Sequence, residues 1–455
     1  MRRLNILALF AFGLSSSAYC QLWEKLVVPG LSYRLEIDNG TNRQTHILRF
    51  SPGANGLSMR PEVAGGKVYA LPADKGRETV TEMVKRTGAV AGINADFFPF
   101  TADPLGAMVR EGEIFSRPDP RRSLMAWGEH SAVFTRLNWS AKAVVGPERV
   151  ITINGLNEEC GENQVVLSTN AAAKSLASAP CIHLVLRVEE GKWAPTSKRE
   201  AAVERVVEGE AELTVEPGYV VLTGRGSRVT ELRSIAAGTK LTIDMQTVGV
   251  DWRIYKHVVS GGPNLLTKGK VDISAEPEGF KGGFETNRHP RTALGRNAQG
   301  DIFLVAVDGR QSMSVGATLE ELASIMAKLG CSDAINLDGG GSTAINVGGL
   351  TLNRPSDGTE RKVANAVLIF AEKPTTAADE EFVLEKITKP NNPRSQTLRI
   401  VTKEGKAMRD AEVFWAAQGS AWIDQGGNLT WLQPGTATVS AYVRGKVITQ
   451  QLELK

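Results

Sequence analysis

The sequence predicts an α+β fold: a mixed α/β sheet with few helices and a β-rich insertion, followed by a small C-terminal β-sandwich. Three observations support this class. Clear helical spacing of apolar residues is rare and is strongest at 318–330. Residues 130–260 contain short apolar runs that are cut by glycines and charged residues, which is typical of strands. Residues 382–455 alternate short strand patterns with turn signals, as in a small sandwich.

The chain has 455 residues, which is about three times the common domain size, so more than one unit is expected. We expect a large unit at 21–372 with the insertion at about 130–255. A polar, proline-containing linker at 373–381 precedes the sandwich at 382–455. The strand spacing of this last unit loosely resembles bacterial immunoglobulin-like modules, for which a spacer or adhesion role is expected.

Residues 1–20 have the features of a signal peptide. Arg2 and Arg3 precede an apolar stretch at 4–14, and small residues follow at 16–18. The protein is therefore expected to be exported, to the periplasm or the medium. Tyr19 directly before Cys20 argues against lipoprotein anchoring. Later in the chain there is no apolar run of about 18 residues, so no membrane span is expected.

Charge and cysteine content narrow the function classes further. The net charge of +3 falls to +1 without Arg2 and Arg3, so no nucleic-acid partner is expected, and 120–122 is interpreted as solvated surface. Cys160 and Cys181 could pair in an oxidising compartment, whereas Cys331 is expected to be a buried thiol. The sequence has five histidines and no Cys-x-x-Cys or His-Glu-x-x-His, which argues against a zinc site of the usual types. It does not indicate an oligomeric state.

One helix has both a start and a stop signal. Thr318 and Glu321 form a capping box, in which each side chain bonds the other residue's amide. Apolar residues then recur at helical spacing until Gly330, which suits a left-handed cap. An earlier helical stretch around Glu78–Thr87 likewise stops at a glycine, Gly88. Each glycine is followed by a short strand pattern.

The two segments also share a polar pair beyond the glycine. Asn94 and Asp96 stand six and eight residues after Gly88, and Asn336 and Asp338 stand at the same distances after Gly330. If the match is real, two Asn-x-Asp sets lie at equivalent strand ends and line one cleft. Coincidence is the alternative.

Asp338 opens the sharpest motif in the chain, Asp338-Gly339-Gly340-Gly341-Ser342. Three consecutive glycines are costly in backbone entropy, and a fold keeps them where the backbone must approach something closely. Bare amides in such a loop can bind an anion. Ser342 adds a hydroxyl and Asp338 a carboxylate. The alternative is a flexible turn with a solvated aspartate.

Two arginines near strand ends suit an anionic ligand. Asp308 and Arg310 follow the apolar strand pattern 302–307, and Arg291 opens another strand pattern with Thr292 beside it. A guanidinium can bind phosphate through two parallel hydrogen bonds. Ordinary turns and paired structural arginines are the alternatives. His289 is a further candidate, and the rings at 97–98 could flank a sugar or pack in the core.

Together these motifs resemble the phosphodiester glycosidase family, over about 85–370. The resemblance is carried by 94–98, 260–263, 290–293, 308–310, 336–342 and 361–366, in the family's order. A common form of the first motif has two glycines after the asparagine, where this chain has Ala95 and Asp96. The resemblance does not extend to 375–455.

The resemblance implies hydrolysis of a sugar 1-phosphodiester at the bond from the anomeric carbon to oxygen, with a glycan or sugar phosphodiester as partner. We expect Asp338 to act as nucleophile or base, with Asp308 or Asp96 as its partner. The residues expected to bind substrate or phosphate are Asn94, Arg291, Thr292, Arg310, Asn336, Gly339, Gly340, Gly341, Ser342 and Asn365.

Two other functions remain open. One is a phosphodiesterase that uses Mg²⁺ or Ca²⁺ held by Asp96, Asp308 and Asp338, because these ions prefer oxygen ligands. The sequence itself requires no cofactor. The other is a glycan-binding protein without catalysis.

Overall fold

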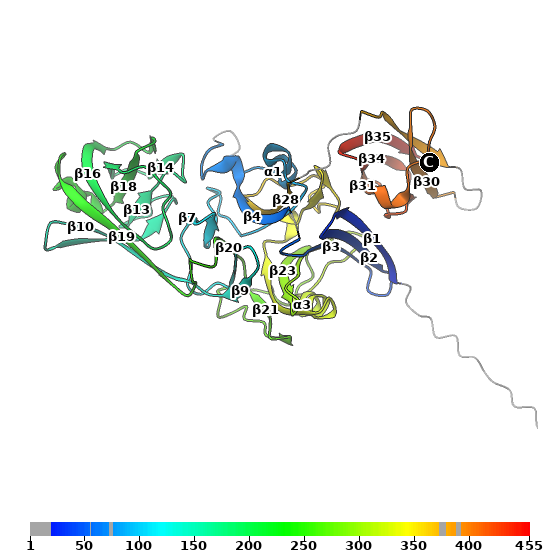
Figure 1. Cartoon of the computed structure of the whole chain (residues 1–455), viewed down its shortest axis with the longest axis horizontal. Helices are drawn as coiled ribbons and strands as arrows, with labels where there is room; N and C mark the ends of the chain where they lie inside the picture. The colour runs from blue at the N-terminus through cyan, green and yellow to red at the C-terminus, as the bar shows by residue number, and fades with distance from the viewer. Residues whose placement is uncertain (1–19, 55, 72–75, 373–378, 388–392) are drawn as a thin grey trace, which may run out of the picture.

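The computed structural model describes residues 20–54, 56–71, 76–372, 379–387 and 393–455. Nearly all of the expected signal peptide and most of the expected linker lie outside these ranges. The expectation of a β-rich α+β fold with few helices is confirmed: three α-helices accompany many strands in the described part of the chain. Figure 1 shows the insertion strands at one end and the C-terminal strands at the other, with the two central sheets between them.

The first central sheet has eight strands, and every pair in it is antiparallel. In spatial order they are β1 (Cys20–Val28), β2 (Leu31–Asp38), β3 (Arg43–Phe50), β24 (Ile302–Val307), β23 (Arg291–Asn297), β25 (Cys331–Leu337), β21 (Asn264–Thr267) and β22 (Lys270–Val271). Strand β24 is buried throughout, because alternate residues face two different cores.

The second central sheet has five strands: β27 (Leu350–Thr351), β26 (Ile345–Val347), β5 (Ala91–Asn94), β28 (Asn365–Ala371) and β4 (Leu57–Val63). Its inner face shares one core with the first sheet, where Ile93 and Val367 meet Leu304 and Ile335. Helices α1 (Val80–Thr87) and α3 (Leu319–Lys328) cover the two outer faces. The layers are therefore helix, sheet, sheet and helix.

The two helices begin and end alike, and the sequence predicts both glycine stops and the start of the second helix. The capping box of Thr318 with Glu321 recurs as Thr79 with Glu82. Gly88 and Gly330 follow the helices with φ of 74° and 83°, which a residue with a Cβ rarely adopts. Each helix then leads into a central strand, β5 or β25, so the repeated spacing reflects repeated structure.

The insertion forms a separate eight-stranded sheet. Its order is β11 (Arg149–Ile153), β10 (Asn138–Val145), β19 (Lys240–Val248), β16 (Ser197–Glu208), β15 (Cys181–Val188), β18 (Tyr219–Arg225), β13 (Val165–Ser168) and β12 (Gly155–Leu156). A two-stranded sheet, β14 (Lys174–Leu176) with β17 (Glu212–Thr214), and helix α2 (Arg228–Arg233) accompany it.

A five-stranded sheet joins the insertion to the centre. Its order is β7 (Glu113–Ser116), β6 (Met108–Arg110), β20 (His257–Ser260), β8 (Leu124–Trp127) and β9 (Ala132–Thr135). Val109 and Val258 pack into the insertion core, while Met125 and Val259 pack into the central one. This sheet therefore belongs to both cores and couples the two parts.

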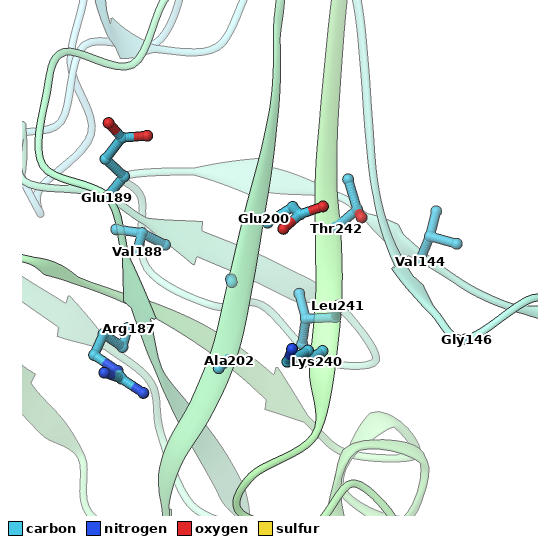
Figure 2. A pocket seen from close by; sticks show the side chains of 11 residues that line it. Val144, Gly146, Arg187, Val188, Glu189, Glu200, Ala202, Lys240, Leu241 and Thr242 are labelled. Atoms are coloured by element: carbon cyan, nitrogen blue, oxygen red, sulfur yellow. The ribbon is translucent and has the colours of Figure 1, made fainter.

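The insertion carries a cavity on β10, β15, β16 and β19 (Figure 2). Arg187, Glu200 and Lys240 line it together with valine, alanine and other residues. None of the residues that the sequence proposes for function lines this cavity, and its strands lie at the far end from β23 in Figure 1.

The C-terminal strands form two facing sheets with one core, as expected for a small β-sandwich. One contains β29 (Phe382–Ile387), β30 (Ser395–Thr402), β33 (Asn428–Trp431) and β32 (Ala421–Ile423), and the other β31 (Val413–Gly419), β34 (Gly435–Val443) and β35 (Lys446–Leu454). Phe414 and Ala416 also pack into the core between the two central sheets. The sandwich therefore packs against the central unit, unlike a free spacer.

Membrane spans and cysteines complete the description. No helix in the described ranges is long and apolar enough to cross a membrane. Cys160 and Cys181 are free thiols that share one small buried cluster, and Cys331 is a buried free thiol. The structure therefore does not contain the possible disulfide between Cys160 and Cys181.

Candidate functional site

The two Asn-x-Asp sets meet where β5 and β25 end. The amide of Asp338 donates to the carbonyl of Ala95 at 2.9 Å. In return, Nδ2 of Asn94 donates to the carbonyl of Asp338 at 2.7 Å. The two sheets are thus joined at the strand ends from which Asp96 and Asp338 project.

Four of the proposed binding residues hold this junction together. Asn94, Thr292, Asn336 and Asn365 are all completely buried. Oδ1 of Asn94 accepts from the Thr292 hydroxyl at 3.0 Å, Nδ2 of Asn336 donates to the carbonyl of Gly262 at 2.8 Å, and Oδ1 of Asn365 accepts from the Asp96 amide at 2.9 Å. Their positions suit a framework role, because buried polar groups need partners of this kind.

Asp96 is completely buried and well paired. Its carboxylate accepts from Nη2 of Arg122 at 3.0 Å and from the amides of Phe97 and Gly106, each at 2.8 Å. Burial raises the pKa of Asp96, while Arg122 and the two amides oppose that shift. Both carboxylate oxygens of Asp96 therefore accept hydrogen bonds from other residues of the protein.

The interpretation of Arg122 as solvated surface is wrong. Its side chain is 7% exposed, and it donates to the carbonyl of Gly261 as well as to Asp96. Its guanidinium carbon lies 4.8 Å from the centre of the Phe97 ring and 5.5 Å from that of Phe280. A buried carboxylate requires a cation, and here the cation comes from the segment that looked like a charged surface turn.

Asp338 has a different environment. Burial raises its pKa to about 6, and the charge of Asp96 acts in the same direction. The Ser342 hydroxyl, Arg361 and the Gly339 amide oppose this shift. Within the described ranges no cation lies at ion-pair distance from Asp338, and the residue is only partly buried. A carboxylate of this kind can take or give a proton near neutral pH.

The glycine loop after Asp338 lies between two guanidinium groups. A Cβ on Gly340 would lie 3.2 Å from Nη2 of Arg310, and one on Gly341 would lie 2.1 Å from Nη2 of Arg361. A side chain at either position would push one arginine away from this backbone, and Gly340 also has a φ of 61° that favours glycine. A backbone hydrogen bond also holds the loop: the Gly340 amide donates to the carbonyl of Pro290 at 2.9 Å.

Arg310 is the better placed of the two arginines expected to bind phosphate. It is exposed, has a φ of 60°, and its Nη2 donates to Nδ1 of His289 at 3.2 Å. Burial lowers the pKa of His289, and the charges of Arg291 and Arg310 lower it further, so the ring is a neutral acceptor. No carboxylate in the described ranges pairs with Arg310, so its charge is available to an anion.

Arg291 occupies a structural position instead. It is 2% exposed, and it donates to the carbonyls of Phe284, Asn287 and Ala317 at 2.7–2.9 Å. Burial, and secondarily Arg310, lowers its pKa to about 10. Its donors are used on backbone carbonyls, so a role in loop support replaces the expected phosphate contact.

Asp308 also faces protein groups. It is 2% exposed, and it accepts from the Arg354 amide at 3.0 Å and lies 3.3 Å from both Nε2 of His46 and Nδ2 of Asn353. His46 in turn hydrogen-bonds the hydroxyl of Tyr33 at 2.8 Å. Asp308 thus anchors the segment that leads to Arg361.

The metal alternative requires Asp96, Asp308 and Asp338 to converge. In the part of the chain that the structure describes, no group of three or more His, Cys, Asp or Glu side chains is arranged to hold a metal ion. The three aspartates therefore do not make the ligand set that this alternative assumed.

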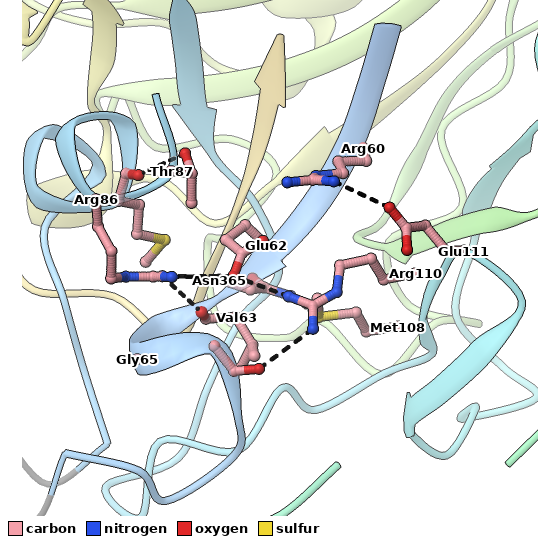
Figure 3. Close-up of polar contacts among 12 residues, drawn as sticks. Arg60, Glu62, Val63, Gly65, Arg86, Thr87, Met108, Arg110, Glu111 and Asn365 are labelled. Atoms are coloured by element: carbon pink, nitrogen blue, oxygen red, sulfur yellow. Dashed lines mark hydrogen bonds and ion pairs between the residues drawn. The ribbon is translucent and has the colours of Figure 1, made fainter. Parts of the chain in front are cut away.

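A buried charge network lies beside Asn365 (Figure 3). Glu62 is 3% exposed and pairs with Arg110 at 2.8 Å and with Arg86 at 3.3 Å. Arg86 also binds Glu78 at 2.8 Å. Val63, which directly follows Glu62 on β4, pairs with Asn365 on β28, and Nδ2 of Asn365 lies 3.7 Å from Sδ of Met108. The network therefore supports the strand that presents Asn365 to Asp96.

Sequence reasoning missed several residues around the site. Phe280 and Phe284 stack at 4.7 Å between ring centres, and Phe97 lies 5.3 Å from Phe280. The rings of Phe97 and Phe280 lie against Arg122, and that of Phe284 lies against Arg291. Of the three, only Phe97 was a candidate. Phe280 and Phe284 follow no strand pattern, so nothing local in the sequence marks them.

Residues 191–370 match the family model described as phosphodiester glycosidase. The matched range contains Asp308 and Asp338 and excludes Asp96. The chain is 40% identical over 82 residues to the Bacillus subtilis SPbeta prophage-derived uncharacterized protein YomE, which is 18% of this chain and 13% of that protein. It is 42% identical over 67 residues to N-acetylglucosamine-1-phosphodiester alpha-N-acetylglucosaminidase of Bos taurus, which is 15% of this chain and 12% of the relative.

Two solved structures share the fold. A hypothetical protein from Synechocystis matches with a TM-score of 0.64 and 25% identity, covering 75% of this chain and 62% of the other. A protein from Burkholderia pseudomallei K96243 matches with a TM-score of 0.61 and 25% identity, covering 72% and 74%. The chain thus spans 12–13% of the length of these curated relatives, and it covers 62% and 74% of the two solved structures.

Proposed function

We propose that the protein hydrolyses a sugar 1-phosphodiester, because residues 191–370 match the family model described as phosphodiester glycosidase. The bond broken is the one from the anomeric carbon to oxygen. The products are the free sugar and a phosphate monoester. The observation that carries the proposal is Asp338, a partly buried carboxyl with a pKa raised to about 6 and no ion-pair partner among the described residues, beside a glycine loop flanked by two arginines.

The chemistry of the substrate fits such a site. A phosphate monoester is a weak base, so its departure needs less protonation than that of an ordinary sugar alcohol. The harder tasks are to hold the phosphate and to stabilise positive charge at the anomeric carbon. Arg310 supplies charge for the first task and His289 orients it, whereas Arg361 is paired with Asp357 at 2.5 Å. The carboxylate of Asp338 supplies the negative charge that stabilises the anomeric carbon.

Asp338 acts as the nucleophile or as the base that activates water. Asp96 lies close enough to raise its pKa but is held by Arg122 and by backbone amides. We therefore assign Asp96 a positioning role. Asp308 takes a similar role through the Arg354 amide.

We further propose that the sugar is an N-acetylglucosamine-like unit of an exported or cell-envelope glycan. The name of the bovine relative supports the sugar. The signal-like pattern of residues 1–20 supports export. The aromatic cluster of Phe97, Phe280 and Phe284 offers apolar surface next to Asp96.

A product assay tests the proposal. The full chain is incubated with methyl N-acetyl-α-glucosaminyl phosphate, and free sugar and methyl phosphate are quantified. The wild type should release both in equal amounts, and Asp338→Asn should lower the rate by at least about 10³-fold. Asp333→Asn is the matched control, because it removes a partly exposed carboxylate from the same strand. Full activity in Asp338→Asn would contradict the assignment of Asp338 as nucleophile or base. Binding without turnover by the wild type would favour a glycan-binding protein.

A further inference from the structure

An ion pair lies against the glycine loop at the proposed phosphate site. Nε and Nη2 of Arg361 both donate to Oδ2 of Asp357, at 2.9 and 2.5 Å. A Cβ on Gly341 would lie 2.2 Å from that same carboxylate oxygen and 2.1 Å from Nη2 of Arg361. The pair therefore rests directly on the backbone of Gly341. The Asp357 side chain is 37% exposed and that of Arg361 43%, so a ligand in solution can reach both.

The segment that carries Asp357 is anchored on both sides of it. Before Asp357, the amide of Arg354 donates to the carboxylate of Asp308 at 3.0 Å. After it, the carboxylate of Glu360 accepts from the amide and the hydroxyl of Thr81, at 3.0 and 2.6 Å. These contacts tie the segment to two different elements of the central unit. The carboxylate of Asp357 is therefore a fixed charge of the loop and its surroundings.

Positive and negative charges meet at two consecutive glycines. Arg310 lies against Gly340, while Arg361 and Asp357 lie against Gly341. Two guanidinium groups and one carboxylate together leave a net charge of +1 beside this backbone. Without the carboxylate the same place would carry both guanidinium charges. The carboxylate of Asp357 thus sets how much negative charge the loop can accept.

Phosphate diesters and phosphate monoesters differ in charge. A diester carries a single negative charge, whereas a monoester carries about −1.5 to −2 at pH 7 because its second pKa is about 6. The Coulomb energy between a ligand and a fixed carboxylate is proportional to the charge of the ligand. Asp357 therefore opposes a dianion about twice as strongly as a monoanion. The net charge of +1 beside the two glycines matches a diester.

We propose that Asp357 is a specificity-determining residue that makes the anion site select phosphate diesters over phosphate monoesters. The inference rests on the proposed function, in which the diester is the substrate and a monoester is a product. Asp357 weakens the hold of the site on the monoester, so this product leaves more readily. For the same reason the site excludes sugar 1-phosphates, which are dianions at neutral pH. Arg310 remains the cation that contacts the phosphate.

Two competitive inhibitors that differ by one methyl group and one charge test this role. At about pH 8 methyl phosphate is a dianion and dimethyl phosphate is a monoanion. Asp357→Asn removes the charge and keeps an oxygen that accepts from Arg361. It should lower the inhibition constant of dimethyl phosphate about threefold and that of methyl phosphate about tenfold, because doubling the ligand's charge squares the factor.

Glu208→Gln is the matched control. It removes the charge of a similarly exposed carboxylate, which pairs with Arg233 at 2.8 Å in the insertion, and it should change neither inhibition constant. Equal factors for the two inhibitors in Asp357→Asn, or no change in either, would overturn the role in charge selection. Weaker binding of both would also overturn it, because it would show that Asp357 only positions Arg361.

Binding of the two anions can be measured apart from catalysis by ³¹P NMR titration of the wild type and of Asp357→Asn. If the wild type does not cleave methyl N-acetyl-α-glucosaminyl phosphate but the variant binds the two anions more tightly by the two expected factors, the proposed function fails and the charge selection stands. If the wild type cleaves the diester and the variant binds both anions as the wild type does, the charge selection fails and the proposed function stands.

Discussion

The segments 79–96 and 318–338 follow the same plan and end in carboxylates with different environments. Both begin with a threonine–glutamate capping box, both turn at a left-handed glycine, and both continue into a central strand. Arg122 and backbone amides then neutralise Asp96, whereas Asp338 has a pKa of about 6 and no ion-pair partner in the part of the chain that the structure describes. Local sequence thus sets the position of a carboxylate, and distant residues set its chemistry.

The largest expected difference between the two carboxylates is in stability. Asp96→Ala leaves the buried guanidinium of Arg122 without its carboxylate, which should lower the free energy of unfolding by about 3–5 kcal/mol. Asp338→Ala removes a carboxylate whose raised pKa shows that folding disfavours its ionised form, so at neutral pH it should raise the free energy of unfolding rather than lower it. Thermal or urea unfolding of the two variants measures this. Equal losses would mean that the two sites are not distinct in the way described.

The two arginines of the anion region allow a second contrast. Arg310→Ala should raise KM for the methyl diester about 10- to 100-fold, because a charge-assisted contact to phosphate is lost. Arg291→Met should chiefly lower the melting temperature, because the carbonyls of Phe284, Asn287 and Ala317 lose their donor. Steady-state kinetics and melting curves of both variants separate the roles. A large KM effect in Arg291→Met with unchanged stability would reverse the assignment.

The pH dependence should follow the raised pKa of Asp338. As a nucleophile or base, Asp338 must be ionised, so kcat/KM should fall about tenfold per pH unit below pH 6 and level off above it. The folded-state pKa lies above the ordinary 3.8, so this group contributes stability that is fully present below pH 3.8 and is lost as pH rises to about 6. Asp338→Asn should remove that part of the stability profile. Activity that instead declines above pH 6 would make Asp338 a general acid.

The smallest effects are expected at the helix caps, where the two segments should behave alike. Thr79→Ala and Thr318→Ala each remove one capping hydrogen bond and should cost about 1 kcal/mol of stability. Valine at either position preserves bulk without the hydroxyl and serves as a control. A much larger cost at one cap would show that the two segments are not structurally equivalent.

Local signals predicted much of the framework. The capping box at Thr318, the glycine stops and the spacing to Asp96 and Asp338 depend on neighbours in the chain, and the structure contains all of them. The three-glycine loop also lies where arginine side chains approach its backbone, as its composition indicates. The β-sandwich at the C-terminus follows from turn and strand patterns alone.

The remaining features depend on pairings across long separations. The Arg122 partner of Asp96 comes from a segment that looked solvated, and the partners of Asp308 come from 46, 353 and 354. Arg291 and Arg310 both stand at strand ends. The side chain of Arg291 is buried and supports a loop, whereas that of Arg310 is exposed, and no local pattern in the sequence distinguishes the two. Lys25 meets Val413 across 388 positions, a contact that no local pattern signals.

The position of bond cleavage tests the central claim most directly. The full-length protein hydrolyses methyl N-acetyl-α-glucosaminyl phosphate in water enriched in ¹⁸O, and mass spectrometry locates the label in the two products. Cleavage at the anomeric carbon predicts one ¹⁸O in the released sugar and none in methyl phosphate. Label in the phosphate product would show attack at phosphorus and would contradict the assignment of this site as a phosphodiester glycosidase.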